Sequence, residues 1–198
     1  MCGPTASGKS TVGKALARSV SSLCVSISTT TRAPREGESD GVDYHFVTEA
    51  EFARRVSEGL FLEHAVFGSE RYGTEKRNTD RALIEKVDLL LTIDVQGVSF
   101  LKTHYPERTV VIFLFPPSFA VLEKRLAARA TESMEETNKR LGIARKEIEI
   151  LTSPGFSDYL VINDRVEDSL RSLRAICAAE RGKLARIRKE NLTQLVLK

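Results

Sequence analysis

The 198-residue sequence contains no tryptophan, only two methionines and only three cysteines. The cysteines, Cys2, Cys24 and Cys177, are odd in number and have no paired spacing, which argues against a disulfide framework or a zinc knuckle. The longest apolar run, residues 110–115, is far too short to span a bilayer, and no secretory signal pattern opens the chain. We therefore expect reduced thiols, a cytoplasmic location and no membrane partner.

A large excess of one charge is also lacking. The 30 basic and 27 acidic residues leave a net charge of +3, which gives no reason to expect a nucleic-acid partner. The length fits one domain, the composition is that of an ordinary globular protein, and the chain has neither an internal repeat nor a low-complexity linker. We expect a monomer or a homodimer.

The most informative stretch that is present lies at the start of the chain. Residues 3–10, which read GPTASGKS, fit the phosphate-binding pattern G-x-x-x-x-G-K-[ST]. Gly3 and Gly8 let the backbone curl so that successive N–H groups point at phosphate oxygens. Lys9 then reaches the β- and γ-phosphates, and the Ser10 hydroxyl is placed to ligate Mg²⁺. A glycine-rich turn before an ordinary helix is the weaker alternative, and the motif alone does not identify a second substrate.

Hydrophobic periodicity predicts helices that alternate with strands. The near-continuous apolar runs at 88–93 and 109–115 are typical of strands buried on both faces of a parallel sheet. This alternation predicts an α/β fold with a doubly wound parallel sheet, in which phosphate sites lie at the carboxyl ends of strands. Expected helices are 9–18, 49–58, 76–85, 119–128, 134–151 and a long one from 166; further strands are 23–28, 44–47, 61–67 and 158–162, and residues 28–38 and 68–74 are expected to be loops.

The phosphate-binding loop normally follows a buried strand, yet only Met1 and Cys2 precede Gly3. We favour a natural start upstream of Met1. The alternative is a sheet whose first, central strand is truncated, with a poorly anchored loop.

A second polar stretch, residues 29–44, holds Arg32 and Arg35 three positions apart, close to Glu38 and Tyr44. Two guanidinium groups with a phenol are well suited to holding a phosphate dianion. On spacing alone, a solvated polar loop is an equally good interpretation.

Together the two stretches resemble the guanylate kinase family, and the resemblance covers nearly the whole chain. Beyond the phosphate-binding loop, the matching motifs are STTTRAPREGE (28–38), GVDYHFV (41–47), FLEHA (61–65), YGT (72–74), IDVQG (93–97), PPS (116–118), RLAAR (125–129) and IND (162–164). The resemblance implies ATP-dependent phosphorylation of GMP and dGMP, with Mg²⁺ as cofactor and ATP and GMP as partners. It also implies one domain with a P-loop NTPase-type core (1–31, 76–125 and 150–198), a small α+β GMP-binding segment (32–75) and a helical lid (126–149).

The GMP contacts follow from this resemblance. A carboxylate at Glu63 can accept hydrogen bonds from both N1–H and the 2-amino group of guanine, whereas adenine presents an acceptor at N1 and is disfavoured. A surface charge on a strand is the alternative interpretation of Glu63. The family pattern implies that Arg32, Arg35, Tyr44 and Tyr72 hold the GMP phosphate, that Glu38 supports the arginines, and that Ser28, Glu63 and Thr74 read the base.

The ATP contacts follow in the same way, although Arg125 and Arg129 alone would fit a solvated helix face. The resemblance implies that Lys9, Arg35, Arg129 and Arg140 surround the migrating phosphoryl group, and that Ser10 and Asp94 belong to the Mg²⁺ shell, Asp94 through water. Arg125 and Asn163 would lie near the adenine ring. The implied ATP contacts are Gly3, Pro4, Thr5, Ala6, Ser7, Gly8, Lys9, Ser10, Thr11, Arg125 and Asn163.

One position departs from the family pattern. The residue two before Asp94 is usually acidic and helps to bind guanine, but here it is Thr92. A hydroxyl brings no charge, so we expect GMP binding to be weaker by about 1–3 kcal/mol.

Two other functions fit parts of the pattern. The first is a guanylate-kinase-like scaffold domain, but such domains typically lack a working phosphate-binding loop and lid. The second is a ribose bisphosphate phosphokinase; Glu63 and the arginines of residues 29–44 argue against this function, while Thr92 leaves some room for it.

Overall fold

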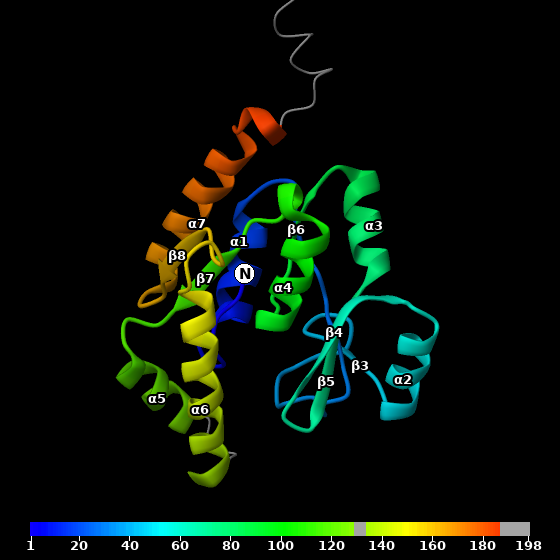
Figure 1. Cartoon of the computed structure of the whole chain (residues 1–198), viewed down its shortest axis with the longest axis vertical. Coiled ribbons are helices and arrows are strands. Elements are labelled where there is room, and N and C mark those ends of the chain that lie inside the picture. The colour runs from blue at the N-terminus through cyan, green and yellow to red at the C-terminus, as the bar shows by residue number, and fades with distance from the viewer. Residues whose placement is uncertain (129–133, 187–198) are drawn as a thin grey trace, which may run out of the picture.

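The computed structural model describes residues 1–128 and 134–186 (Figure 1). Helices and strands alternate along the core, as predicted, and three predicted elements have the expected bounds, namely those at 61–67, 76–85 and 134–151. In chain order the elements are α1 (Lys9–Ser19), β1 (Leu23–Val25), β2 (Thr29–Thr30), β3 (His45–Phe46), α2 (Glu49–Ser57), β4 (Phe61–Phe67), β5 (Glu70–Glu75), α3 (Lys76–Glu85), β6 (Asp88–Leu90), α4 (Val95–His104), β7 (Ile112–Phe115), α5 (Phe119–Ala127), α6 (Met134–Leu151), β8 (Tyr159–Ile162) and α7 (Val166–Arg181), with short 3₁₀ turns at Pro106–Arg108 and Leu184–Arg186.

Two parallel strand pairs, β1–β6 and β7–β8, form the core sheet, and Met1 and Cys2 join them at its centre. The Met1 carbonyl accepts from Ile93 N–H at 3.3 Å on the β6 side. On the β7 side, Cys2 N–H donates to the Ile112 carbonyl at 2.9 Å and the Cys2 carbonyl accepts from Leu114 N–H at 2.8 Å. Two residues thus supply the backbone pairing of a central strand. These bonds hold the chain immediately before Gly3, so the loop is not poorly anchored, as the less favoured alternative supposed.

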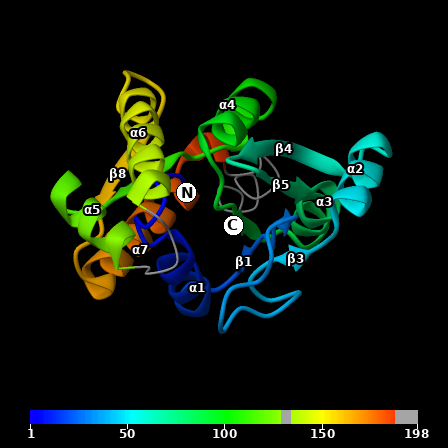
Figure 2. The ribbon, with the colours of Figure 1, turned by 90° about the horizontal axis from the view of Figure 1, so that it is seen from below.

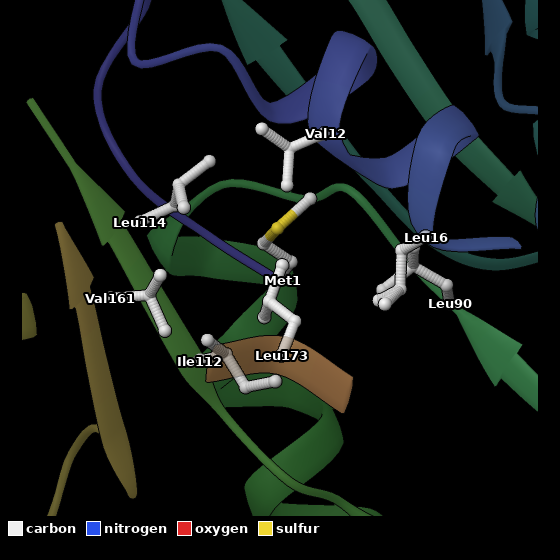
Figure 3. Packing of buried hydrophobic residues seen from close by; sticks show 8 residues of the cluster. All are labelled: Met1, Val12, Leu16, Leu90, Ile112, Leu114, Val161 and Leu173. Atoms are coloured by element: carbon white, nitrogen blue, oxygen red, sulfur yellow. The ribbon is translucent and has the colours of Figure 1, made fainter. Parts of the chain in front are cut away.

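The core sheet is covered on both faces, which is the doubly wound arrangement. Because successive side chains of a strand point to opposite faces, Met1 joins one buried cluster and Cys2 the other. Met1 packs with Val12 and Leu16 of α1 and Leu173 of α7 (Figure 3). On the other face the cluster contains Cys2, Val98, Leu101, Phe113 and Leu151, so α4 and α6 cover it. Burial of these apolar side chains is the main force that holds the two layers of helices to the sheet.

A second sheet lies to one side of the core, with α2 and α3 beside it (Figure 2). We call it the side sheet; its strand order is β3-β2-β5-β4, with β5 antiparallel to both neighbours. Residues 68–74 and 28–38 were expected to be loops, but Glu70–Glu75 form β5 and Thr29–Thr30 form β2. The sequence of β5, ERYGTE, is polar and contains a glycine, so its strand conformation comes from pairing with β4 and β2 rather than from propensity.

Side-chain caps explain where several helices begin. The Thr48 hydroxyl accepts from Glu51 N–H at 3.2 Å at the start of α2, as the capping pattern there predicts. Asp94 caps α4, a helix that hydrophobic periodicity did not reveal, by accepting from Gly97 N–H at 2.9 Å. In the described part of the chain, no helix is both long enough and apolar enough to cross a membrane.

Candidate active site

The phosphate-binding loop lies at the carboxyl edge of the core sheet and leads into α1, with Gly8 as the helix N-cap in a left-handed conformation. Gly3 has φ of +147°, and a Cβ there would lie 2.2 Å from the Leu114 carbonyl oxygen, so no other residue fits without displacing β7. The Lys9 ammonium donates to the carbonyls of Gly3 and Pro4 at 2.7 and 3.0 Å. The loop thus presents a cation and a helix N-terminus at the same point, which is an anion site.

Asn163, the residue that follows strand β8, supports this loop. Its side-chain amide donates to the Ser7 carbonyl at 2.8 Å, and its side-chain oxygen accepts from the Ser169 hydroxyl at 3.0 Å. The residue is only 4% exposed. Arg125 in turn donates to the Asn163 carbonyl at 3.0 Å. The structure therefore gives Asn163 a role in holding the loop, and its predicted adenine contact stays a prediction.

A cavity of about 890 Å³ joins the phosphate-binding loop to the side sheet. It is large enough for a substrate, because ligand pockets typically measure some 300–1,000 Å³. Most of the predicted site residues line it: Gly3, Thr5, Ala6, Gly8, Lys9, Ser10, Thr11, Ser28, Arg32, Arg35, Glu38, Tyr44, Glu63, Tyr72, Asp94 and Arg140. The predicted residues Pro4, Ser7, Thr74, Arg125 and Asn163 are not part of this lining, and Arg129 lies outside the described residues.

The polar stretch at residues 29–44, which carries Arg32 and Arg35, lines the end of the cavity away from the phosphate-binding loop. One nitrogen of the Arg32 guanidinium group, Nη2, donates to both carboxylate oxygens of Glu38, at 2.9 and 2.8 Å. Arg35 N–H also donates to Glu38, at 2.8 Å. Partial burial acts to raise the pKa of Glu38, but these hydrogen bonds outweigh it and hold the pKa below its ordinary value. Glu38 therefore stays ionised, and it holds the side chain of Arg32 and the main chain of Arg35 in place.

Two tyrosines complete this end of the cavity. The Arg32 guanidinium lies over the Tyr44 ring, 5.4 Å from its centroid, and the rings of Tyr44 and Tyr72 meet edge to face at 6.0 Å. Burial raises the pKa of Tyr44, so its phenol is neutral and can donate a hydrogen bond. The arrangement offers guanidinium and phenol donors to an anion.

Glu63 projects into the same cavity from β4. Burial raises the pKa of Glu63, and the neighbouring Asp94 carboxylate raises it further, while contact with Thr74 acts in the opposite direction. Thr74 lies opposite Glu63 in the β4–β5 pairing. A Cβ at Gly97 would come within 3.0 Å of a Glu63 carboxylate oxygen, so the absent side chain leaves room for that group. Glu63 can accept two donors from a ligand that enters the cavity.

Asp94 and Ser10 are the residues that could hold a divalent cation. Both line the cavity beside Lys9, and both offer oxygen ligands. Mg²⁺ in kinases is typically bound through one or two protein oxygens together with phosphate oxygens and waters. No cluster of three acidic, histidine or cysteine ligands occurs in the described residues, and this donor set fits a cation that arrives with a nucleotide.

Helix α6 brings three further residues to the cavity that sequence reasoning missed, Lys139, Ile143 and Glu147. Arg140, Ile143 and Glu147 are spaced i, i+3, i+7, which puts them on one helix face and could have signalled their role. Burial, opposed by Lys9 and reinforced by Asp94, raises the pKa of Glu147 to about 7. A carboxyl that is partly protonated near neutral pH thus faces the phosphate-binding loop.

The core sheet, the phosphate-binding loop and the arginine-lined cavity define a P-loop nucleotide kinase. A sequence model described as guanylate kinase matches residues 1–180. The guanylate kinase of Clostridium perfringens (strain 13 / Type A) is 41% identical over 192 residues, which cover 97% of this chain and 87% of that protein. The guanylate kinase of Methylobacillus flagellatus is 42% identical over 178 residues, or 90% of this chain and 86% of that protein. A crystal structure of guanylate kinase from Anaplasma phagocytophilum has a TM-score of 0.79 and 31% identity, and the match covers 98% of this chain and 92% of that chain.

The chain belongs to the guanylate kinase family. The family model and both relatives extend across the core and the side sheet, so both halves of the cavity are included in the match.

Proposed function

We propose that this chain transfers the γ-phosphoryl group of ATP to the phosphate of GMP, and of dGMP, to give ADP and GDP or dGDP. A GMP phosphate oxygen forms the new bond to the γ-phosphorus while the bond to the β,γ-bridging oxygen breaks, and the electron pair leaves with ADP. One observation carries the proposal: a single cavity holds the phosphate-binding loop at one end and the Arg32–Glu38 pair with Glu63 at the other. That arrangement suits two nucleotides that meet phosphate to phosphate.

The GMP end works by charge and hydrogen bonding. Arg32, Arg35, Tyr44 and Tyr72 bind the acceptor phosphate, and Glu38 supports both arginines, through the Arg32 guanidinium group and through the main-chain N–H of Arg35. Ser28, Glu63 and Thr74 bind the base. The Thr74 hydroxyl is buried opposite Glu63 in the β4–β5 pairing and contacts the Glu63 carboxylate, so we assign it to the same base site.

The ATP end works by alignment and charge neutralisation, since a loose phosphoryl-transfer transition state needs little covalent help. The loop N–H groups and Lys9 hold the β- and γ-phosphates, and Arg35 and Arg140 bind oxygens of the group in transit. Ser10, directly, and Asp94, through water, would hold Mg²⁺, which when bound would neutralise charge on the phosphate oxygens. Arg129 has the same proposed role as Arg140, and residues 126–149 form the proposed lid that excludes water.

A scaffold-type binding domain is the second candidate for this fold, and a ribose bisphosphate kinase is the third. The ordered contacts of Lys9 and the presence of Arg140 in the cavity favour an enzyme over a scaffold. The position of Glu63 in the cavity favours a base-bearing acceptor. A cytoplasmic location and a monomeric or dimeric state, without nucleic-acid or membrane partners, belong to the same proposal.

A coupled assay of ADP release tests the proposal, with Mg²⁺, ATP and, in turn, GMP, dGMP, AMP, UMP and ribose 1,5-bisphosphate. We expect GMP and dGMP to be used with kcat/KM at least about 100-fold above the other acceptors, because the base site is built from specific hydrogen bonds. Purified Lys9→Met protein is the control for contaminating kinases. Equal use of all acceptors, or of ribose 1,5-bisphosphate alone, would contradict the proposal.

A further inference from the structure

An ion pair that lies outside the cavity connects the helix behind the phosphate-binding loop with the turn that carries Tyr44. Lys14 on α1 forms an ion pair with Asp43, which immediately precedes Tyr44. The Lys14 side chain is 36% exposed and that of Asp43 is 19% exposed, so the pair is partly shielded from water. Asp43 lies within the family motif GVDYHFV (41–47), but neither residue has been assigned a role in substrate binding or in the transfer reaction described above.

On the core side, Lys14 belongs to the same rigid element as the phosphate-binding loop. It lies four residues after Ser10, one helical turn further along the same face of α1. Val12 and Leu16 bury the opposite side of the helix at 0% and 1% exposure. The position of the Lys14 stem is therefore determined by the core packing that also determines the phosphate-binding loop.

On the other side, Asp43 organises the turn that carries Tyr44. Its second carboxylate oxygen accepts from Ser39 N–H at 2.9 Å, and Gly41 N–H donates to the Tyr44 carbonyl at 2.8 Å. Hydrogen bonds from Lys14 and from Ser39 lower the pKa of Asp43, so the carboxylate is ionised at neutral pH. A shift of Asp43 would move Tyr44, and with it the Arg32 guanidinium that lies over the Tyr44 ring.

We propose that the Lys14–Asp43 ion pair is a positioning contact, which sets the place of the acceptor-phosphate ligands Tyr44 and Arg32 relative to the phosphate-binding loop. This inference rests on the proposed function, because it assumes that a phosphate bound by Tyr44 and Arg32 receives the phosphoryl group. It predicts an effect on GMP use that spares ATP binding, since α1 and the phosphate-binding loop keep their own packing.

The test is steady-state kinetics of Lys14→Gln, Asp43→Asn and the double variant. Asparagine keeps a side-chain oxygen for Ser39 N–H, so the two single variants remove the same charge attraction. We expect KM for GMP to rise about two- to fivefold in each, as loss of a partly exposed ion pair implies, with kcat lowered by a smaller factor and KM for ATP unchanged. The double variant should be no worse than either single one, because the contact is lost only once.

Three controls separate positioning from a general effect. Lys14→Arg keeps the charge and should keep KM for GMP within about twofold of the parent value. Arg18→Gln removes a charge from the exposed end of the same helix and should change no constant. The thermal midpoints of all variants should agree, because the pair is partly exposed.

Additive effects in the double variant, or equal rises in KM for GMP and for ATP, would overturn the inference. If the parent protein phosphorylates GMP and Lys14→Gln has the same KM for GMP, the inference is overturned and the proposed function stands. A parent protein that neither binds nor phosphorylates GMP overturns the proposed function and this inference with it.

Discussion

The two ends of the cavity are held in place by different forces. The phosphate-binding loop depends on main-chain hydrogen bonds from β7 and on the buried clusters of the core, with Met1 and Cys2 between the strands. The side sheet also has strand pairing and the stacked rings of Phe52 and Phe61, but charged side chains connect its elements as well. Buried Glu75 accepts from Thr29 and Arg55, both at 2.7 Å, and pairs with Arg77.

This difference matches the different tasks that we propose for the two ends of the cavity. Apolar packing is dense and tolerates little displacement, so the end that aligns the transferred group is built from it. Ion pairs and hydrogen bonds distinguish one polar ligand from another, so the end that selects the acceptor is built from them. Changes at the loop should therefore reduce the rate, whereas changes at the side sheet should alter the choice and affinity of the acceptor.

The largest expected effect is at the phosphate-binding loop. Lys9→Met should lower kcat about 100- to 1,000-fold, because a preorganised cation is lost where charge develops in the transition state. Steady-state rates at saturating ATP over a range of GMP concentrations measure kcat together with KM for GMP. Lys146→Met, an exposed change on α6, is the control and should leave kcat unaltered. If Lys9→Met raised only KM for GMP and left kcat unchanged, the proposed difference between the two ends would be contradicted.

The next effect is at the base site of the side sheet. Glu63→Gln should raise KM for GMP about 10- to 100-fold, because one charged acceptor is lost and the new amide meets a guanine donor. The ratio of kcat/KM for GMP to that for AMP should fall with it. Initial rates over a range of GMP concentrations at fixed ATP measure both quantities. The comparison fails if KM for ATP changes as much as KM for GMP.

A smaller effect in the opposite direction is expected at Thr92, which lines the cavity beside Asp94. Thr92→Asp adds a charged acceptor for guanine and should lower KM for GMP about fivefold. The gain is limited because a new carboxylate also repels Glu63 and Asp94. Thr92→Asn, which adds the volume without the charge, is the matched control. An unchanged KM for GMP in Thr92→Asp would refute the proposed weakness at this position.

The smallest effect is a pH dependence of stability that arises from Glu147, at the loop end. Because the pKa of Glu147 is raised to about 7, the folded chain binds a proton that the unfolded chain releases above its own pKa. The free energy of unfolding should therefore fall as pH rises from about 5 to about 8, by about 1 kcal/mol after allowance for solvent screening.

Urea denaturation at several pH values measures this contribution. Glu147→Gln should be more stable than the parent chain near pH 8 and should match it near about pH 5. Glu149→Gln, at an exposed position on the same helix, should follow the parent curve. Parallel curves for the parent and Glu147→Gln would show that the group does not titrate as described.

Much of the core could be predicted from the sequence because its signals are local. The α1 helix follows from the loop motif and its apolar face, and α2 follows from the Thr48 cap. By contrast, β5 was missed because its polar sequence becomes a strand only when β4 and β2 lie on either side of it. The role of Asn163 beneath the loop also depends on a contact between residues 156 positions apart.

The sequence by itself determined the motif of the phosphate-binding loop and most of the helices and strands of the core, because these depend on residue type, spacing and periodicity among a few neighbouring residues. The resemblance to the guanylate kinase family depends instead on motifs along nearly the whole chain. Only the tertiary structure decided that Met1 and Cys2 pair with strands at the centre of the core sheet, that Glu147 faces Lys9, and that Lys14 meets Asp43. Such contacts are set by the way apolar faces pack, and packing brings together residues that no local pattern connects.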